Sequence, residues 1–232
     1  MIKKTGHYLK ILITNPFGVI RSFICKMRSI YFSSYIDEGS GQISVSDPWL
    51  RIKIKKSKGA KLIINGHFRI TPHLGGTTPV RILLDCNSML KIDGDFVIGH
   101  GVRLFVHENA FLYFGGKKFE SDSGITADTL IMTYKKISVG FDFICAWNVF
   151  ISDSDWHLIN TKPHYGDVTI GDHGWIANNC SVLKGSNIGN NSIVASHSKV
   201  INQKYASGSM LAGTPAKIVE SDVNWSRDIK TK

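Results

Sequence analysis

A histidine with acidic neighbours is the clearest candidate for chemistry in this chain. Residues 153 to 157 read DSDWH, so two carboxylates and an indole lie within four positions of His157. An imidazole with a pKa near neutrality can take a proton from a hydroxyl nucleophile, and Asp153 or Asp155 could hold its second ring nitrogen. The same residue types also bind metal ions and form turns. The surrounding sequence has to decide among these three roles.

A repeat of six residues in the surrounding sequence indicates the fold. From residue 170 onward every sixth residue is Ile or Val, at 170, 176, 182, 188, 194 and 200, and the fifth position of five blocks is small. This period fits neither a helix nor a long flat strand. It predicts a chain that turns a corner every six residues, so that three faces close a coil. Successive coils would stack by parallel strand pairing, about 4.8 Å apart.

The repeat is weaker upstream and is interrupted twice. Blocks in a similar register recur between residues 92 and 151, with breaks at about 115–124 and 157–169. We predict loops at both breaks, and insertions in repeat folds often carry function. His157 lies where the second break begins. The predicted organisation is all-β: an irregular β lead-in over 39–80, a parallel β-helix over 81–215 with its loop at 157–169, and a short tail over 216–232.

The first 38 residues form an apolar and basic segment that we predict to be helical. Four basic residues and a Pro-Phe-Gly sequence interrupt its apolar stretch. No apolar run therefore reaches the roughly 18 to 20 residues that a membrane-spanning helix needs. Two interpretations stay open. The segment packs on the body of the protein, or it is a basic amphipathic segment that contacts an anionic membrane.

Composition and charge limit the partners and the compartment. The chain has 232 residues, 43% of them hydrophobic, and a formal charge of +10 that favours anionic partners. The basic strand WLRIKIKK at 49–56 lacks the interleaved aromatic residues of a nucleic-acid platform, so we expect no nucleic-acid partner. Four cysteines without a CxxC pair favour reduced thiols in the cytoplasm and no structural zinc site.

The blocks from Ile170, followed by MLAGTPAKIV at 210–219, resemble the hexapeptide-repeat acyltransferases, including galactoside and maltose acetyltransferases and polysaccharide O-acetyltransferases. The resemblance is specific over about 139–219. It implies a left-handed β-helix, a homotrimer with active sites between subunits, and acetyl coenzyme A as acyl donor. NVFISDSDWH is similar to the family's NVxIxDxxH-like stretch, which places the catalytic base at His157. Asp153 or Asp155 would orient that base.

The resemblance also implies a substrate class and further site residues. The expected reaction is direct acetyl transfer, without a metal, to a sugar hydroxyl of a surface polysaccharide, lipopolysaccharide or precursor. The predicted acceptor-binding residues are Asp128, Trp147 and Trp156, although packing between subunits explains the two tryptophans equally well. The predicted coenzyme A residues are Asn178, Ala195, Ser196, Ala212 and Gly213, with Lys204 and Lys217 near its phosphates.

Three other functions remain open at this point. A sugar N-acyltransferase acting on an amino-sugar nucleotide would use the same fold and donor. A β-helix carbonic anhydrase would bind zinc through histidines, and the chain offers five candidates: His100, His107, His157, His164 and His173. A purely structural β-helix would leave the DSDWH segment without a purpose. The AGTPAK segment favours acyl transfer over both of the last two.

Overall fold

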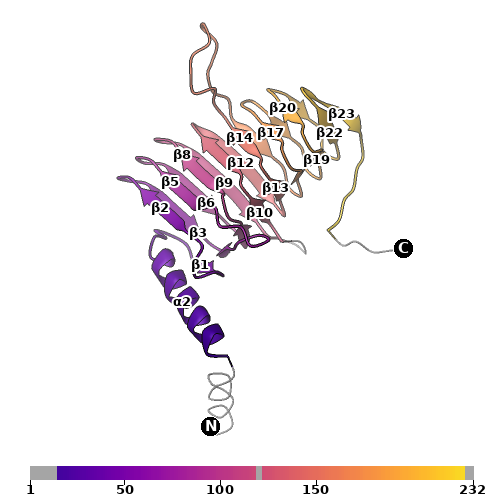
Figure 1. Ribbon diagram of the computed structural model, residues 1–232. Coiled ribbons are helices and arrows are strands. Elements are labelled where there is room, and N and C mark those ends of the chain that lie inside the picture. Colours follow the sequence, from indigo (N-terminus) through magenta and orange to yellow (C-terminus); the bar gives the residue numbers. More distant parts are fainter. Residues whose placement is uncertain (1–14, 119–121, 228–232) are drawn as a thin grey trace, which may run out of the picture.

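The computed structural model describes residues 15–118 and 122–227, and it shows a helix followed by a rod of short strands (Figure 1). The helix, α2, spans Pro16–Ser33. Asn15 caps its N-terminus, because its Oδ1 accepts the backbone N–H of Gly18 at 2.8 Å, and Pro16 occupies the first helical position. No helix among the described residues is long and apolar enough to cross a membrane.

The strands belong to three sheets. Sheet 1 contains β1 (Gln42–Val45), β4 (His67–Ile70), β7 (Phe96–Ile98), β10 (Gly124–Ala127), β13 (Ile144–Trp147), β16 (Trp175–Ile176), β19 (Ile193–Val194), β22 (Met210–Gly213) and β23 (Ala216–Glu220). Sheet 2 contains β2 (Ile52–Lys56), β5 (Val80–Leu84), β8 (Arg103–Val106), β11 (Leu130–Thr133), β14 (Phe150–Ser152), β17 (Ser181–Val182) and β20 (Lys199–Val200). Sheet 3 contains β3 (Lys61–Ile64), β6 (Met89–Ile92), β9 (Phe111–Gly116), β12 (Lys136–Phe141), β15 (Val168–Ile170), β18 (Asn187–Ile188) and β21 (Lys204–Tyr205).

Each strand pairs with the strand three places later, so the chain passes through the three sheets in turn and then begins the next coil. The pairing is parallel throughout this ladder, and only β22 and β23 pair antiparallel. Such a winding is a parallel β-helix. The all-β parallel coil predicted from the repeat of six is therefore confirmed.

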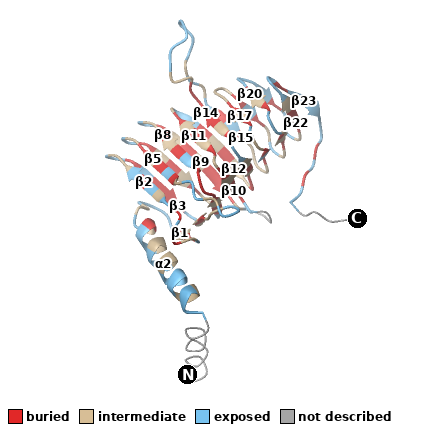
Figure 2. Cartoon of the chain, in the orientation of Figure 1, coloured by how far each residue is buried: buried red, intermediate tan, exposed pale blue. Residues whose placement is uncertain are grey.

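The aliphatic residues of the repeat fill the interior of the rod, which Figure 2 shows as buried. The six that open the blocks are each at most 1% exposed: Ile170, Ile176, Val182, Ile188, Val194 and Val200. Burial of each such side chain contributes about 1.5–3 kcal/mol to folding. The corners suit asparagine, because Asn148 and Asn179 both have φ of 56°, in the left-handed region that Asn tolerates. The period of six thus encodes both the core and the corners.

The parallel ladder begins earlier than predicted. β1 pairs with β4 in register from Gln42, within the segment 39–80 for which an irregular lead-in was expected. The reason is that loops of several residues separate these strands, so the period of six is lost while the inward alternation remains. Ile43 and Val45, for example, are 1% and 3% exposed. The predicted loop at 115–124 lies partly outside the described residues.

Two segments leave the regular coil. The chain between β14 and β15, residues 153–167, projects away from the rod (Figure 1), close to the loop predicted at 157–169. The tail that begins at Ala216 first forms β23 and then returns along the rod. There Trp225 stacks on His173 with ring centroids 3.9 Å apart and donates to the His173 carbonyl at 3.0 Å. The loop that carries DSDWH is the larger departure from the repeat.

Candidate active site

His157 lies near the start of the projecting loop, with an exposed side chain. Within the described residues its imidazole makes no hydrogen bond or ion pair. Trp156, directly before it, has a φ of 63°, so the backbone turns sharply at this point. The geometry therefore presents the imidazole of His157 to solvent instead of burying it as a packing residue.

Asp153 is fully buried and its partners are backbone groups of the preceding coil. Its carboxylate accepts the N–H groups of Tyr134 at 2.6 Å and of Lys135 and Lys136 at 2.7 Å each. Burial raises the pKa of the Asp153 carboxyl above its ordinary value, and the three N–H donors act in the opposite direction. The expectation that Asp153 orients His157 is not met, because both carboxylate oxygens bind the turn before β12.

Asp155 braces the loop against the next coil. Its carboxylate forms an ion pair with the ammonium of Lys184, which also donates to the carbonyl of Pro163 at 2.7 Å. The backbone N–H of Asp155 donates to the carbonyl of His164 at 2.7 Å. Asp155 therefore fixes both arms of the loop, and it does not contact His157 in this structure.

Trp156 is held by two serines at the base of the loop, one through its side chain and one through its backbone. Its indole N–H donates to the hydroxyl of Ser152 at 3.1 Å, and its backbone N–H donates to the hydroxyl of Ser154 at 3.0 Å. The Ser154 hydroxyl also lies 3.2 Å from Nδ1 of His164. These contacts set the direction of the chain immediately before His157.

Aromatic rings surround Trp156 at this corner between sheets 2 and 3. The ring centroid of Tyr134 lies 5.7 Å from Trp156, 5.0 Å from His107 and 4.6 Å from His164. Phe105 lies 5.7 Å from Trp156. We call this set the loop-base cluster; its members are Phe105, His107, Tyr134, Trp156, His164 and Tyr165. It forms an apolar and π-rich surface next to His157.

Tyr134 and Lys184 were not predicted from the sequence as site residues. His164 was predicted only as a candidate zinc ligand. A signal for Tyr134 was present, since it follows β11 at the same place where His107 follows β8, and such positions stack in register. Lys184 carried no signal, because it lies 29 residues from its partner Asp155 and on another coil. These residues link the loop to the coils on both sides of it.

Most predicted coenzyme A residues lie along one corner, between sheets 1 and 2. The hydroxyl of Ser196 donates to Oδ1 of Asn178 at 2.7 Å, across two successive coils. Ala195 donates its backbone N–H to the carbonyl of Leu211 at 2.8 Å, so β19 and β22 carry the row onward to Ala212 and Gly213. These five residues, which are small or polar, form a row along this corner of the rod.

Lys204 and Lys217 lie at the C-terminal end of the rod, where Lys217 pairs with Ala212 of this row. They line one cavity of about 370 Å³ together with Tyr205 and Pro215. Both side chains are exposed. The two lysines are therefore brought together, as the prediction of a shared phosphate-binding role requires.

The predicted acceptor residues are divided between two corners. Asp128 and Trp147 lie at the corner between sheets 1 and 2, where Oδ2 of Asp128 is 3.4 Å from Nε2 of His100. A cavity of about 360 Å³ there is lined by Asp128 with Arg81, Arg103 and Asn148. Trp156 lies at the corner between sheets 2 and 3. The single chain does not assemble the three residues into one site.

The five histidines of the zinc alternative do not converge within one chain. His100 faces Asp128, His173 stacks on Trp225, and His107 and His164 contact Tyr134. Over residues 15–118 and 122–227 no group of three or more His, Cys, Asp or Glu side chains is placed to hold a metal ion.

The coil and its repeat define the class of the protein as a parallel β-helix of hexapeptide type. No known protein-family model matches the chain. An uncharacterized 24.8 kDa protein in the cps region of Klebsiella pneumoniae is 27% identical over 182 residues, which cover 75% of this chain and 78% of that protein. The putative lipopolysaccharide biosynthesis O-acetyl transferase WbbJ of Escherichia coli strain K12 is 28% identical over 149 residues, which cover 58% of this chain and 72% of that protein.

Two solved structures are also similar. The polysialic acid O-acetyltransferase OatWY matches 83% of this chain and 92% of its own, with 22% identity and a TM-score of 0.42. The polySia-specific acetyltransferase NeuO matches 86% and 92%, with 18% identity and a TM-score of 0.39. The predicted resemblance to polysaccharide O-acetyltransferases is confirmed by the similarity in sequence to WbbJ.

Proposed function

We propose that this protein is an acetyl coenzyme A-dependent O-acetyltransferase that modifies a sugar hydroxyl of a surface polysaccharide, lipopolysaccharide or precursor in the cytoplasm. The observation that carries the proposal is the free imidazole of His157, presented by a loop that the coils on both sides hold in place. The similarity to a putative lipopolysaccharide O-acetyl transferase supports the acceptor class.

His157 supplies the general base. Its neutral imidazole takes the proton of the sugar hydroxyl as the oxygen attacks the thioester carbonyl of the donor. A tetrahedral intermediate forms, the carbon–sulfur bond breaks, and the imidazolium returns the proton to the departing thiolate. The products are the acetylated sugar and free coenzyme A. The two carboxylates of DSDWH have other roles: Asp153 anchors the turn beneath the loop and Asp155 anchors the loop itself.

The donor would lie along the row formed by Asn178, Ala195, Ser196, Ala212 and Gly213 at the corner between sheets 1 and 2. We call this row the donor row. Small residues such as Ala195 and Gly213 leave room for an extended pantetheine arm, and Asn178 and Ser196 offer hydrogen-bonding groups to its amides. Lys204 and Lys217 would bind the phosphates at the end of the rod. A positive pair at that position suits the most highly charged part of coenzyme A.

The resemblance to the hexapeptide-repeat acyltransferases implies a homotrimer, and the separation of donor row and base within one chain supports a site shared between chains. In one chain the donor row lies at the corner between sheets 1 and 2. His157 follows β14 and lies at the corner between sheets 2 and 3. Direct transfer requires the base, the hydroxyl and the thioester within contact distance. Neighbouring chains that bring the donor row of one against the loop of another would complete three equivalent sites. Trp156 and the loop-base cluster would then form a platform for the sugar ring.

The decisive experiment compares His157→Ala with the wild-type protein. Coenzyme A release from acetyl coenzyme A is measured against a panel of nucleotide sugars and intact glycans, with His67→Ala as a matched control on the second coil. We expect His157→Ala to lower turnover by about two orders of magnitude or more with coenzyme A binding retained. Near-normal turnover by this variant would remove His157 from the mechanism. Stoichiometric zinc with no thioester-dependent activity would favour the carbonic anhydrase alternative.

A further inference from the structure

α2 buries Phe32 in the core at 6% exposure, but its hydrogen bonds and ion pair to the rod come from polar side chains, whereas an ordinary surface helix turns a wholly apolar face inward. β1 is the edge strand of sheet 1, and its free backbone groups need partners. The hydroxyl of Ser33 accepts the N–H of Ile43 at 2.9 Å and lies 3.1 Å from the Ile43 carbonyl. The hydroxyl of Ser29 accepts the N–H of Val45 at 2.9 Å. The polar face of α2 therefore caps the open edge of the first coil.

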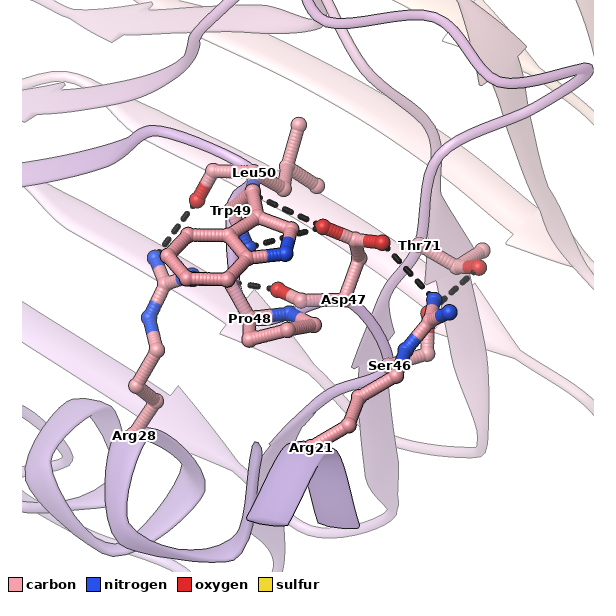
Figure 3. Close-up of polar contacts among 8 residues, drawn as sticks. All are labelled: Arg21, Arg28, Ser46, Asp47, Pro48, Trp49, Leu50 and Thr71. Atoms are coloured by element: carbon pink, nitrogen blue, oxygen red, sulfur yellow. Dashed lines mark hydrogen bonds and ion pairs between the residues drawn. The ribbon is translucent and has the colours of Figure 1, made fainter. Parts of the chain in front are cut away.

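Two arginines fix the helix in this orientation (Figure 3). The guanidinium of Arg28 donates to the carbonyls of Asp47 at 3.1 Å, Pro48 at 2.6 Å and Leu50 at 2.5 Å. Arg21 forms an ion pair with the Asp47 carboxylate at 2.8 Å. A guanidinium that satisfies three carbonyls holds the helix at a defined rotation. The direction of the opposite face is therefore built into the structure.

The opposite face carries large apolar side chains, and Figure 2 shows much of α2 as exposed. Phe17 is 84% exposed and Phe23 is 63% exposed, although buried positions are normal for phenylalanine. Positions three or four apart share one side of a helix, and large apolar residues occupy this side along its whole length. We call these residues the α2 face: Phe17, Ile20, Phe23, Met27, Ile30 and Tyr31. An apolar stripe of this length on a fixed helix indicates a binding surface.

The charge around the α2 face selects its partner. The first 36 residues contain no Asp or Glu, and their basic residues are Lys3, Lys4, Lys10, Arg21, Lys26 and Arg28. An apolar helical face with Lys and Arg and without acidic residues is typical of helices that lie in the surface of an anionic bilayer. A second copy of this chain would instead bring two positively charged segments together. The composition therefore favours anionic lipid over self-association at this surface.

We propose that the protein binds the surface of an anionic bilayer through the α2 face, with the helix lying in the interfacial region and the rod held on its polar side. The apolar side chains would enter the boundary between headgroups and acyl chains, and Lys26 would contact the headgroups. Binding to the bilayer does not require acetyl transfer. A variant that loses membrane binding can therefore still be assayed for acetyl transfer, and an inactive variant can still be assayed for membrane binding.

The test uses the full-length protein and vesicle flotation. Vesicles contain phosphatidylcholine alone or with about a third phosphatidylglycerol, so that the charge requirement is measured directly. We expect the protein to float with the anionic vesicles and to be released by salt. Phe23→Glu should reduce the floated fraction by about tenfold, since it places a carboxylate in the apolar stripe. The matched control is Val219→Glu, a 60% exposed position on β23 at the opposite end of the rod, which should float normally.

Three results would overturn the proposal. Normal flotation of Phe23→Glu would show that the α2 face does not contact lipid. A fall in molar mass of Phe23→Glu in the absence of lipid, measured by light scattering, would show that a second copy covers this face. If Phe23→Glu does not fold, the wild-type protein still decides, because it should float with the anionic vesicles and not with phosphatidylcholine alone. Failure of the wild-type protein to float with anionic vesicles would also contradict the proposal.

Discussion

The carboxylate of Asp153 lies 2.6 Å from the backbone nitrogen of Tyr134, a residue of the preceding coil. Two further N–H groups of the same turn, those of Lys135 and Lys136, donate to its other oxygen. A fully buried acceptor with three backbone donors holds the corner from which the loop leaves the rod. Asp153 therefore positions the active-site loop through the backbone, without touching the imidazole of His157.

We predict that Asp153→Asn destabilises the protein more than it changes the chemistry. The amide of asparagine presents a donor where the turn also presents donors, so at least one buried N–H loses its partner. The expected loss is about 2–3 kcal/mol in the free energy of unfolding, measured by urea denaturation. Coenzyme A release by the folded fraction should retain the wild-type pH profile. Unchanged stability with a shifted pH profile would instead show that Asp153 acts on His157.

The ion pair between Asp155 and Lys184 gives a second prediction. Asp155→Asn and Lys184→Met should each loosen the loop and lower kcat/KM by about tenfold, because a loosely held base is misplaced for attack. Each change should cost less than about 1 kcal/mol in stability, since the pair is partly exposed. The exchanged pair, Asp155→Lys with Lys184→Asp, should recover much of the lost activity if the bridge itself matters. Failure of the exchange alongside intact loop structure would assign Asp155 a direct role.

The cysteines give a prediction on reactivity. Burial raises the pKa of the Cys145 thiol to about 12, and burial also raises the pKa of Cys180, whereas Cys86 is exposed. The thiolate is the reactive form, so the Cys145 thiol stays protonated and unreactive between pH 7 and 9, and burial makes Cys180 less reactive than an exposed thiol. A disulfide-exchange reagent at pH 8 should modify Cys86 rapidly and Cys145 only on unfolding. Cys86→Ser should remove the fast phase, and rapid labelling of Cys145 would contradict its place in the core.

Much of the rod could be predicted because its signal is local. Ile170 and the aliphatic residues at every sixth position after it each point inward, and each coil repeats the same information. The first coil could not be predicted, because the loops around β2 lengthen the spacing and hide the register. The roles of Asp153 and Asp155 could not be predicted either. Their partners are 19 and 29 residues away on other coils, and nothing within DSDWH shows which groups those coils will offer.

The proposed sharing of the active site between chains gives the sharpest prediction. His157→Ala removes the base at the corner between sheets 2 and 3. Ser196→Trp would block the donor row at the corner between sheets 1 and 2. Each variant alone should be nearly inactive, the first with coenzyme A binding retained and the second without it. If each site takes its base from one chain and its donor row from another, mixed trimers contain some sites with neither defect.

Co-expression of the two variants with different affinity tags, followed by purification through both tags, isolates the mixed trimers. Every mixed trimer, with two copies of one variant and one of the other, contains one site that combines an intact loop with an intact donor row, so about a third of the shared sites should be active. The measurement is coenzyme A release per site relative to wild type. A site built within one chain would give no recovery, because every chain then carries one defect or the other. Recovery near a third would establish that the loop of His157 works against the donor row of a neighbour.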